Sequence, residues 1–494
     1  MLKKINPNWN LSIISITILL SIVLSIFVLA NPEGTSIFLL GIYSKLSIIF
    51  ESSFMYGSFA LLSFLLVLAL SRYGKIELAI PSKPTYSMTS WCSMLFSAGI
   101  GATLLYWSTV EWIEYYNILS KDKSFPAEDV LIYSRTYPLF HWGFTAWAIY
   151  CLPAVAFGLA LTLRPESNQT FSGILNIQNK IFKFILDILF IGAIICGAGV
   201  GLGLSFPLIS SVVSKIFVID RTIGLDLAII SSCAIIFGTS AYVGVQRGIK
   251  RLSNINILLV VIFLLFILAL GPTKYILINS SETITHLFKN YLQFSLTTGT
   301  DISRDWSVFY WAWWYALAPM VGTFLMNISN GKTLREIILG TILVGSFGCM
   351  ISMLILSNLS ISLFESNIIN GPAIIENSII SRDALVVNTI SSLDYGYLLL
   401  ICFSIILFIF LCTTYDSASY VLASASMKTS NSESSKSLRL LFAVLLVVQP
   451  TLLMYLGGVD SFKWIMVIFS IPLLFIYVLL IISILKNVYR IKKS

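Results

Sequence analysis

The sequence predicts an all-α polytopic membrane protein with about twelve transmembrane helices, from its composition, its recurring apolar stretches and the placement of its charges. Of its 494 residues, 57% are hydrophobic and 11% are charged, whereas soluble proteins carry about 25% charged residues. Barrel strands would be shorter and would alternate in polarity, so helices are the interpretation that fits.

The apolar stretches define the expected spans in chain order. Each is long enough for a helix to cross a bilayer, and they lie near residues 11–31, 53–71, 90–116, 137–163, 183–213, 224–245, 254–275, 307–328, 336–363, 393–426, 437–457 and 463–485. The longest connecting pieces are 117–136, 276–306 and 364–392, so no separate soluble domain is expected. Residues 282–298 fit either an amphipathic helix on the outer face or an ordinary loop.

The charges orient the expected helices, and the net charge of +8 follows from their placement. With both termini inside, one side receives Lys3, Lys4, Arg72, Lys75, Arg164, Lys180, Arg247, Lys250, Arg251, Lys332, Arg335, Lys428, Lys436, Arg439, Lys486, Arg490, Lys492 and Lys493. The other side receives mixed or acidic loops with Asp122, Glu128, Asp129, Glu282, Asp301, Asp305, Glu365, Glu376 and Asp383. This positive-inside pattern predicts a multi-pass protein of the plasma or inner membrane with cytoplasmic N- and C-termini. It gives no reason to expect a nucleic-acid partner.

The chain offers little material for catalysis or a metal centre. Its seven cysteines lie in apolar stretches without a close Cys-x-x-Cys pair, so we expect them to be packing residues. A membrane enzyme would need an acidic metal-binding pair or a nucleophile near a loop, and neither is evident, so we expect no enzyme and no cofactor. The first apolar stretch is too long for a signal peptide and lacks a small-residue cleavage site, so we expect it to remain as a span.

The most informative local feature is the run Trp311-Ala312-Trp313-Trp314. Nine of the eleven tryptophans lie in three segments, 91–112, 142–147 and 306–314. Isolated membrane tryptophans usually serve lipid packing or an interfacial belt. Clustered indole faces favour binding of a cation, above all a quaternary ammonium group that cannot form hydrogen bonds.

A second aromatic segment complements this run. Trp142, Trp147 and Tyr150 lie within a helical arc of about 140°. If this helix faces the one that carries Trp314, several rings could surround one trimethylammonium group. A desolvated cation–π contact contributes about 2 kcal/mol, so three or four such contacts support binding without a buried carboxylate. We expect Trp311 to be structural.

The surroundings of the rings indicate the kind of ligand. No acidic residue lies within 99–109, 142–150 or 311–324, which favours a methylated ammonium over a primary amine. A helix break is predicted between Ser97 and Thr103, because each glycine there destabilises a helix by about 1 kcal/mol. Backbone N–H groups around Gly99, Gly101 and Thr103 could hold a ligand carboxylate. Close packing is the alternative role of these glycines, and the favoured role of the run 197–203.

A second break is predicted at Thr413-Thr414-Tyr415-Asp416-Ser417. Hydroxyls and free carbonyls at such a break can supply some of the about five or six oxygens that sodium needs. Asp416, a charge within an apolar stretch, is either an ion ligand or a structural hydrogen-bond acceptor. Glu111 is expected near the outer end of its helix, in a structural polar contact.

These residues together resemble the signature of the betaine/carnitine/choline transporter (BCCT) family. The resemblance rests on the run from Trp306 to Trp314, on Ala318-Pro319 and on residues 328–336. Further matches are residues 96–101, His141-Trp142, residues 246–254 and the stretch 413–417. They extend from the third expected span to the tenth.

The resemblance implies a leucine-transporter-like core of two inverted five-helix repeats preceded by two peripheral helices. Residues 1–80 would form the peripheral helices, and 81–430 the core, with halves of about 90–275 and 276–430. Residues 431–494 would form two last helices and a short basic tail. Alternating access and a homotrimer in the lipid bilayer are implied as well.

The resemblance also assigns roles to residues. It implies a substrate box of Trp142, Trp147, Tyr150 and Trp314, hereafter the aromatic box, with Trp313 nearby. Tyr106 and Phe324 fall at gate positions. The backbone carbonyls of Ser97 and Ile100 and the hydroxyls of Thr413 and Thr414 fall at a central sodium site.

Some positions depart from the family pattern. Leu317 stands where many members carry an aromatic residue. Thr103 stands where choline-selective members carry an acidic residue, and its neutrality favours a zwitterion such as betaine. The run 199–203 lacks the hydroxyls that some members use for a second sodium. The short C-terminal tail predicts little tail-mediated activation.

We therefore expect a secondary active importer of a quaternary-ammonium zwitterion of the glycine betaine type, coupled to sodium. The alternatives within the same family are sodium-independent exchange of carnitine or betaine and transport of choline or dimethylsulfoniopropionate. A channel is the alternative from another class, and accumulation of solute against its gradient would exclude it.

Overall fold

The computed structural model describes residues 8–80, 83–98, 101–243, 246–428 and 435–493. In these residues regular structure is helical, and the only β-type pairings are two isolated bridges, Trp9 with Met427 and Glu77 with Thr333. The all-α class is thus confirmed for the described part of the chain.

The helices follow one another in the order expected of a polytopic protein. They are α1 (Leu11–Ala30), α2 (Pro32–Leu70), η1 (Arg72–Lys75), α3 (Met88–Ala98), α4 (Ala102–Leu119), α5 (Val130–His141), α6 (Phe144–Leu163), α7 (Phe171–Leu175), α8 (Lys180–Phe217), α9 (Ile223–Val243), α10 (Gln246–Leu270), α11 (Thr273–Leu296), η2 (Ser303–Ser307), α12 (Val308–Ile328), α13 (Leu334–Gly340), η3 (Thr341–Gly345), α14 (Ser346–Glu365), α15 (Gly371–Glu376), α16 (Arg382–Ser391), α17 (Gly396–Ala425) and α18 (Lys436–Lys493). The elements η2 and η3 are π-helical turns.

Eight described helices are long and apolar enough to cross a membrane, and the bent pair α3–α4 would make a ninth. The other three expected spans also coincide with helices, in α9, α12 and the first part of α18. The total of twelve, the inverted repeats and the division at residues 80 and 430 stay predictions. α2 begins at Pro32, well before the expected start, because Asn31 caps it and the proline takes the first helical position.

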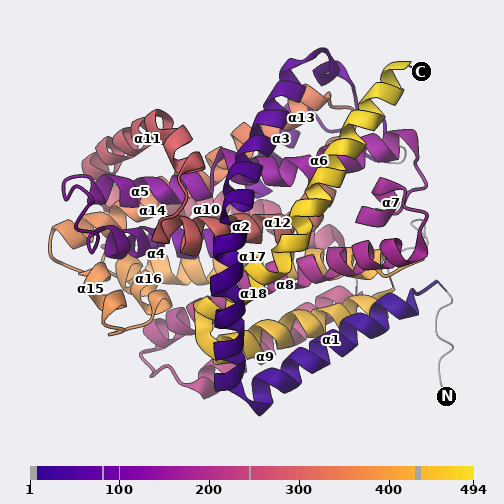
Figure 1. The fold of residues 1–494 in the computed structure, drawn as a ribbon. Helices are drawn as coiled ribbons and strands as arrows, with labels where there is room; N and C mark the ends of the chain where they lie inside the picture. The colour runs from indigo at the N-terminus through magenta and orange to yellow at the C-terminus, as the bar shows by residue number, and fades with distance from the viewer. Residues whose placement is uncertain (1–7, 81–82, 99–100, 244–245, 429–434, 494) are drawn as a thin grey trace.

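The two ends of the molecule carry different segments (Figure 1). The start of α1, the end of α18 and α7 lie on the right of the view, whereas α11, α15 and α16 lie on the left. The segments assigned to the acidic side are therefore gathered away from the described chain ends. This separation agrees with the predicted two-sided arrangement, whose assignment to cytoplasm and exterior stays a prediction.

α12 carries the tryptophan run and lies in the middle of the packing. It packs most extensively on α6 and also on α8, α18 and α2. Nearly all of its first two turns are buried, including Trp311 at 1% exposed. The helix tolerates Pro319 in its interior, because packed neighbours stabilise a helix that has lost one backbone hydrogen bond.

Two interruptions shape the region around α12. The predicted early break is confirmed: α3 ends at Ala98, α4 begins at Ala102, and their axes differ by 55°. A second interruption separates α5 from α6 at Trp142-Gly143. A Cβ on Gly143 would lie 2.5 Å from the Leu139 carbonyl oxygen, so this sharp turn requires glycine.

The predicted break at Thr413–Ser417 is wrong, because α17 runs without interruption from Gly396 to Ala425. Hydroxyl residues do not by themselves break a helix, and the stretch holds neither glycine nor proline. The Thr413 hydroxyl donates to the Phe410 carbonyl oxygen at 3.0 Å, which keeps its hydrogen bond inside the helix.

The segment expected as either an amphipathic helix or a loop is helical. α11 extends over Thr273–Leu296 and contacts α5 and α14. The guanidinium of Arg135 on α5 holds it, donating to the Tyr275 hydroxyl at 2.9 Å and to the Asn279 side-chain oxygen. Arg135 is 7% exposed in its side chain, so this attachment lies beneath the helix.

Candidate functional site

The four residues of the aromatic box come together from α6, α12 and the turn that precedes α6. The Trp314 ring centroid lies 5.4 Å from that of Trp142 and 4.5 Å from that of Tyr150. The Trp147 ring lies 5.6 Å from Tyr150 and 6.4 Å from Trp314. All four side chains are between 1% and 7% exposed. The structure thus brings the four rings together as expected, and their role as a substrate site stays a prediction.

The turn between α5 and α6 explains how one segment supplies three of the rings. Trp142 is the last residue before the turn at Gly143, and Trp147 and Tyr150 lie in the first two turns of α6. The backbone turn lets Trp142 approach Trp314 at a steep interplanar angle of 80°. Rings in this arrangement present π faces and edges in several directions, which suits a rounded cation.

Trp313 and Trp311 take the supporting places expected for them. The Trp313 indole N–H donates to the Gly197 carbonyl oxygen at 3.0 Å, which ties α12 to α8. Its ring lies 5.9 Å from Trp142. Trp311 faces Phe140 at 5.3 Å, away from the box residues. Trp313 is thus a neighbour of the box, and Trp311 is a packing residue.

A buried polar network stands directly behind the box. The Trp142 indole N–H donates to Glu111 Oε2 at 2.9 Å, and the Tyr115 hydroxyl donates to Glu111 Oε1 at 2.6 Å. His141 Nδ1 lies 2.8 Å from the Tyr115 hydroxyl, and its Nε2 lies 2.8 Å from the Ser307 hydroxyl. These contacts satisfy both carboxylate oxygens of a fully buried residue.

This network corrects two sequence-based expectations: the position of Glu111 and the absence of acidic residues beside the rings. Glu111 lies in the middle of α4 and is 0% exposed, instead of at the outer end of the helix. The aromatic rings are also not free of acidic neighbours, because its carboxylate touches Trp142. The structural polar contact expected of Glu111 is confirmed. An acidic residue inside an apolar span was the signal that pointed to it.

The early break lies beside α8. Gly101 has extended backbone before α4, with φ −150° and ψ 170°. A Cβ on Gly201 would lie 3.2 Å from the Thr103 hydroxyl oxygen, so Thr103 faces α8. Gly99 and Ile100, which were assigned to substrate and sodium binding, lie outside the described residues.

The remaining residues assigned to sodium are on separate helices. The Ser97 hydroxyl donates to the Ser93 carbonyl oxygen within α3, and the Thr413 hydroxyl bonds within α17. Thr414 is half-buried one residue further along α17. The described contacts do not join these residues, so the sodium site stays a prediction.

The two residues at gate positions differ in exposure. Tyr106 is 3% exposed, and its ring meets Trp107 edge-on at 5.0 Å. Phe324, on the same helix as Trp314 but ten residues later, is 41% exposed. The structure does not bring these two side chains together.

The glycine run on α8 serves packing, as favoured from the sequence. A Cβ on Gly197 would lie 3.0 Å from the Leu317 side chain, and one on Gly203 would lie 2.1 Å from the Phe462 ring. The run therefore lets α12 and α18 approach α8 closely. Leu317, which departs from the family pattern, fills the space against Gly197.

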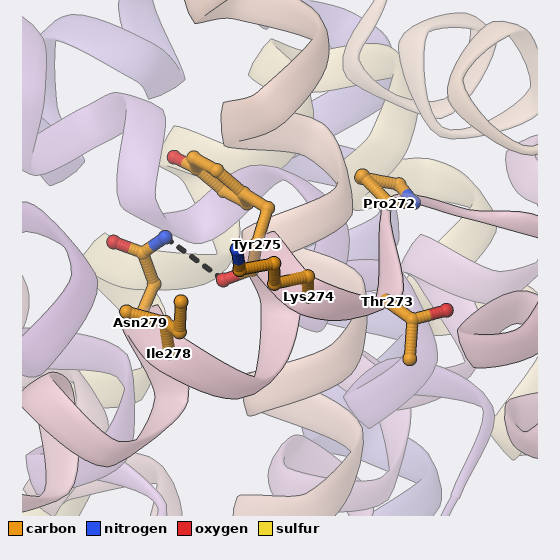
Figure 2. Close-up of a pocket in the computed structure, with 6 residues that line it drawn as sticks. All are labelled: Pro272, Thr273, Lys274, Tyr275, Ile278 and Asn279. Atoms are coloured by element: carbon orange, nitrogen blue, oxygen red, sulfur yellow. Dashed lines mark hydrogen bonds between the residues drawn. The ribbon is translucent and has the colours of Figure 1, made fainter.

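A hollow at the start of α11 is separate from the box (Figure 2). It has a volume of about 590 Å³ and is lined by Pro272, Thr273, Lys274, Tyr275, Ile278 and Asn279. The Asn279 side-chain amide donates to the Tyr275 carbonyl oxygen at 2.8 Å, so that polar group is engaged within the helix. The hollow contains no box residue and gives no reason to move the candidate site.

Comparisons with known proteins identify a family model and several relatives. The family model of betaine/carnitine/choline family transporters matches residues 12–493. A carnitine transporter of Acinetobacter baumannii is 28% identical, over 88% of this chain and 80% of its own length. The glycine betaine transporter OpuD of Bacillus subtilis is 29% identical, over 86% of this chain and 84% of its own. A high-affinity choline transport protein of Escherichia coli is 31% identical, over 57% of this chain and 43% of its own.

Proposed function

This chain belongs to the betaine/carnitine/choline family of transporters, and from this premise we propose that it imports a quaternary-ammonium zwitterion of the glycine betaine type. The importer is a secondary active transporter that works by alternating access. It resides in the inner or plasma membrane with cytoplasmic termini, and it assembles as a homotrimer.

The convergence of Trp142, Trp147, Tyr150 and Trp314 carries this proposal. Three of the rings come from residues 142–150 and the fourth from Trp314, and ring centroids in contact lie 4.5 to 6.4 Å apart. A methylated ammonium has no N–H group to donate, so π faces provide its attraction. The carboxylate of the zwitterion is held by backbone N–H groups of the break that precedes α4, including those of Gly99, Gly101 and Thr103.

The exposure of the gate residues supports access from one side at a time. On the α4 side, Tyr106 is buried, and the Arg382 guanidinium on α16 donates to Glu114 on α4. A second ion pair, between Arg221 and Asp383, joins α16 to the segment after α8. On the other side, Phe324 is partly exposed, and Ser87, Thr89, Ser90 and Ser93 at the start of α3 are exposed. This combination supports the proposal that the chain is described in a state closed outside and open inside.

Sodium is the proposed coupling ion. Ser97, Ile100, Thr413 and Thr414 supply its oxygen ligands in the outward-facing state. In the structure, the Thr413 hydroxyl donates its hydrogen to the Phe410 carbonyl oxygen, which leaves its oxygen lone pairs available to a cation.

The Glu111 carboxylate favours a second candidate, a transporter of choline. Choline carries a net positive charge, and a buried carboxylate 2.9 Å from the Trp142 indole nitrogen attracts such a ligand more than it attracts a zwitterion. Dimethylsulfoniopropionate and carnitine remain alternatives with the same head-group chemistry, and exchange without sodium remains an alternative mode.

Uptake by cells that lack other betaine transporters tests the proposal. We expect saturable accumulation of glycine betaine against its gradient with the wild type, and a loss of this uptake with Trp314→Leu. Trp464→Leu, at a half-buried tryptophan on α18 that is not part of the box, is the matched control and should keep uptake. Unchanged uptake with Trp314→Leu contradicts a role of the box in substrate binding.

Two further outcomes separate the alternatives. Unchanged uptake in sodium-free buffer favours exchange, and preferential uptake of choline favours the second candidate.

A further inference from the structure

The helix that follows α12 contains a π-helical turn that packs against Trp147, one of the box residues. α13, η3 and α14 succeed one another without a break from Leu334 to Glu365, and η3 is the π-helical turn Thr341–Gly345. η3 packs on α6, which carries Trp147 and Tyr150, and on α3, which precedes the break. Such turns inside α-helices are frequently found at functional sites.

Gly345, the last residue of η3, lies against the Trp147 ring. A Cβ at position 345 would lie 2.2 Å from Trp147 Cε3 and 2.4 Å from Cδ2. No side chain fits at that distance, so the indole would have to move. Tyr150 and Trp314 stand near the Trp147 ring, at 5.6 and 6.4 Å. A ring pushed away from η3 would therefore alter the interior of the box.

The π-helical turn explains why this glycine faces the ring. Gly340 contacts an indole ring just as Gly345 does: a Cβ on Gly340 would lie 2.2 Å from Trp91 Cη2. Residues five apart would be separated by about 140° around a regular α-helix. A π-helical turn closes its hydrogen bonds over five residues, which brings the two glycines back toward one face.

Gly348 extends the same contact to the early break. A Cβ there would lie 2.6 Å from the Phe96 carbonyl oxygen, near the end of α3. Glycines 345 and 348 thus let the continuous helix 334–365 pack closely against both Trp147 and the end of α3, which precedes the break.

We propose that Gly345 is a positioning residue that sets the size of the cation the box accepts, by fixing how deep the Trp147 indole reaches. This inference rests on the proposed function, since it concerns the head group of the substrate. With glycine at 345, the ring lies against η3, the position that would leave the most room for the three methyl groups. With a larger residue, the ring advances, and a dimethylammonium group fits better than a trimethylammonium group.

Binding to purified full-length protein tests the proposal. Glycine betaine and dimethylglycine differ by one methyl group and would be titrated by intrinsic tryptophan fluorescence. We expect Gly345→Ala to reduce the preference for glycine betaine by about tenfold, the effect of weakening one desolvated cation–π contact among several. Gly340→Ala is the matched control, because its new methyl group meets Trp91, which is outside the box. It should leave the preference unchanged.

A double variant separates positioning from general damage. Phenylalanine lacks Cε3 and Cζ3, two of the three indole atoms that the new methyl group would strike. In the Trp147→Phe background, Gly345→Ala should therefore change the preference less than it does in the wild type, a non-additivity expected only for groups in contact. The double variant also remains testable if Gly345→Ala alone fails to fold.

The outcomes distinguish this inference from the proposed function. A wild type that binds neither compound nor any other methylated ammonium overturns the proposed function and this inference with it. A wild type that binds glycine betaine, with the same preference retained in Gly345→Ala, overturns this inference alone. Additive effects of Gly345→Ala and Trp147→Phe also overturn it.

Discussion

The indole N–H of Trp142 donates to the carboxylate of Glu111 over 2.9 Å, so a buried acid holds one wall of the aromatic box by its edge. This hydrogen bond fixes the orientation of the Trp142 ring. We expect a carboxylate at the nitrogen edge also to make the ring faces more attractive to a cation. Glu111 is thus a structural residue beside the box, and its role in ligand binding is a prediction.

Removing the Glu111 carboxylate should weaken binding of the cation. We expect Glu111→Ala to raise the Kd for glycine betaine by about tenfold or more, because hydrogen bonds to charged groups contribute about 1.5–3 kcal/mol. Glu111→Gln keeps an acceptor for the indole and should have a smaller effect. Fluorescence titration of the purified variants measures both.

Glu376→Gln is the matched control for this test. Glu376 lies outside the box, and its half-exposed carboxylate pairs with Lys121. Its replacement should leave the Kd within about twofold, since surface ion pairs contribute about 1 kcal/mol or less. A wild-type Kd in Glu111→Ala would contradict a role for this acid in binding.

Removing the hydroxyls assigned to sodium should change the sodium requirement of uptake. We expect Thr413→Val and Thr414→Val each to raise the sodium concentration for half-maximal uptake by about tenfold, the order of effect of disturbing one contact at a metal site. Ser404→Ala removes a hydroxyl on the same helix that bonds the Ile401 carbonyl oxygen. It should leave the sodium dependence unchanged. The same curve in all three variants would argue against this ion site.

The close approach of α18 to α8 depends on the glycine at position 203. A Cβ there would lie 2.1 Å from the Phe462 ring, so we expect Gly203→Ala to lower the free energy of unfolding by about 1–3 kcal/mol. Thermal unfolding in detergent measures the loss. The control is Gly57→Ala on α2, where no atom lies within 4 Å. That change should maintain or raise stability, and equal melting of the two variants would contradict the packing role.

Arg135 should keep α11 attached to the rest of the protein. We expect Arg135→Gln to speed hydrogen exchange of the α11 amides by about tenfold or more, because a buried guanidinium would lose its bonds to Tyr275 and Asn279. Lys289→Gln, at an exposed position of the same helix, is the control. Exchange by mass spectrometry over residues 273–296 reports on both variants, and equal rates in the two would contradict the attachment.

The parts of the site that could be predicted from sequence were those with local signals. Tryptophan spacing indicated which rings share a face, and the glycines at 99 and 101 predicted the break between α3 and α4. The helices were recognisable from long apolar stretches, because a bilayer demands them.

The parts that could not be predicted depend on contacts between distant segments. Glu111 and Trp142 are 31 residues apart, so no local sequence pattern indicates the hydrogen bond between them. The break expected at Thr413–Ser417 was wrong because polar residues were weighed above helix propensity. The π-helical turn at Thr341–Gly345 has no sequence signature of its own. Its possible role is evident only from the structure, in which Gly345 lies against the Trp147 ring.

The central claim is that the box of Trp142, Trp147, Tyr150 and Trp314 binds a cation through its π faces. The most direct measurement compares the Kd of glycine betaine with that of 3,3-dimethylbutyrate, the isostere in which an uncharged carbon replaces the nitrogen. We predict that glycine betaine binds at least about a hundredfold more tightly, because the isostere loses two or more cation–π contacts while retaining shape and carboxylate. Equal affinity for the two compounds would contradict the claim.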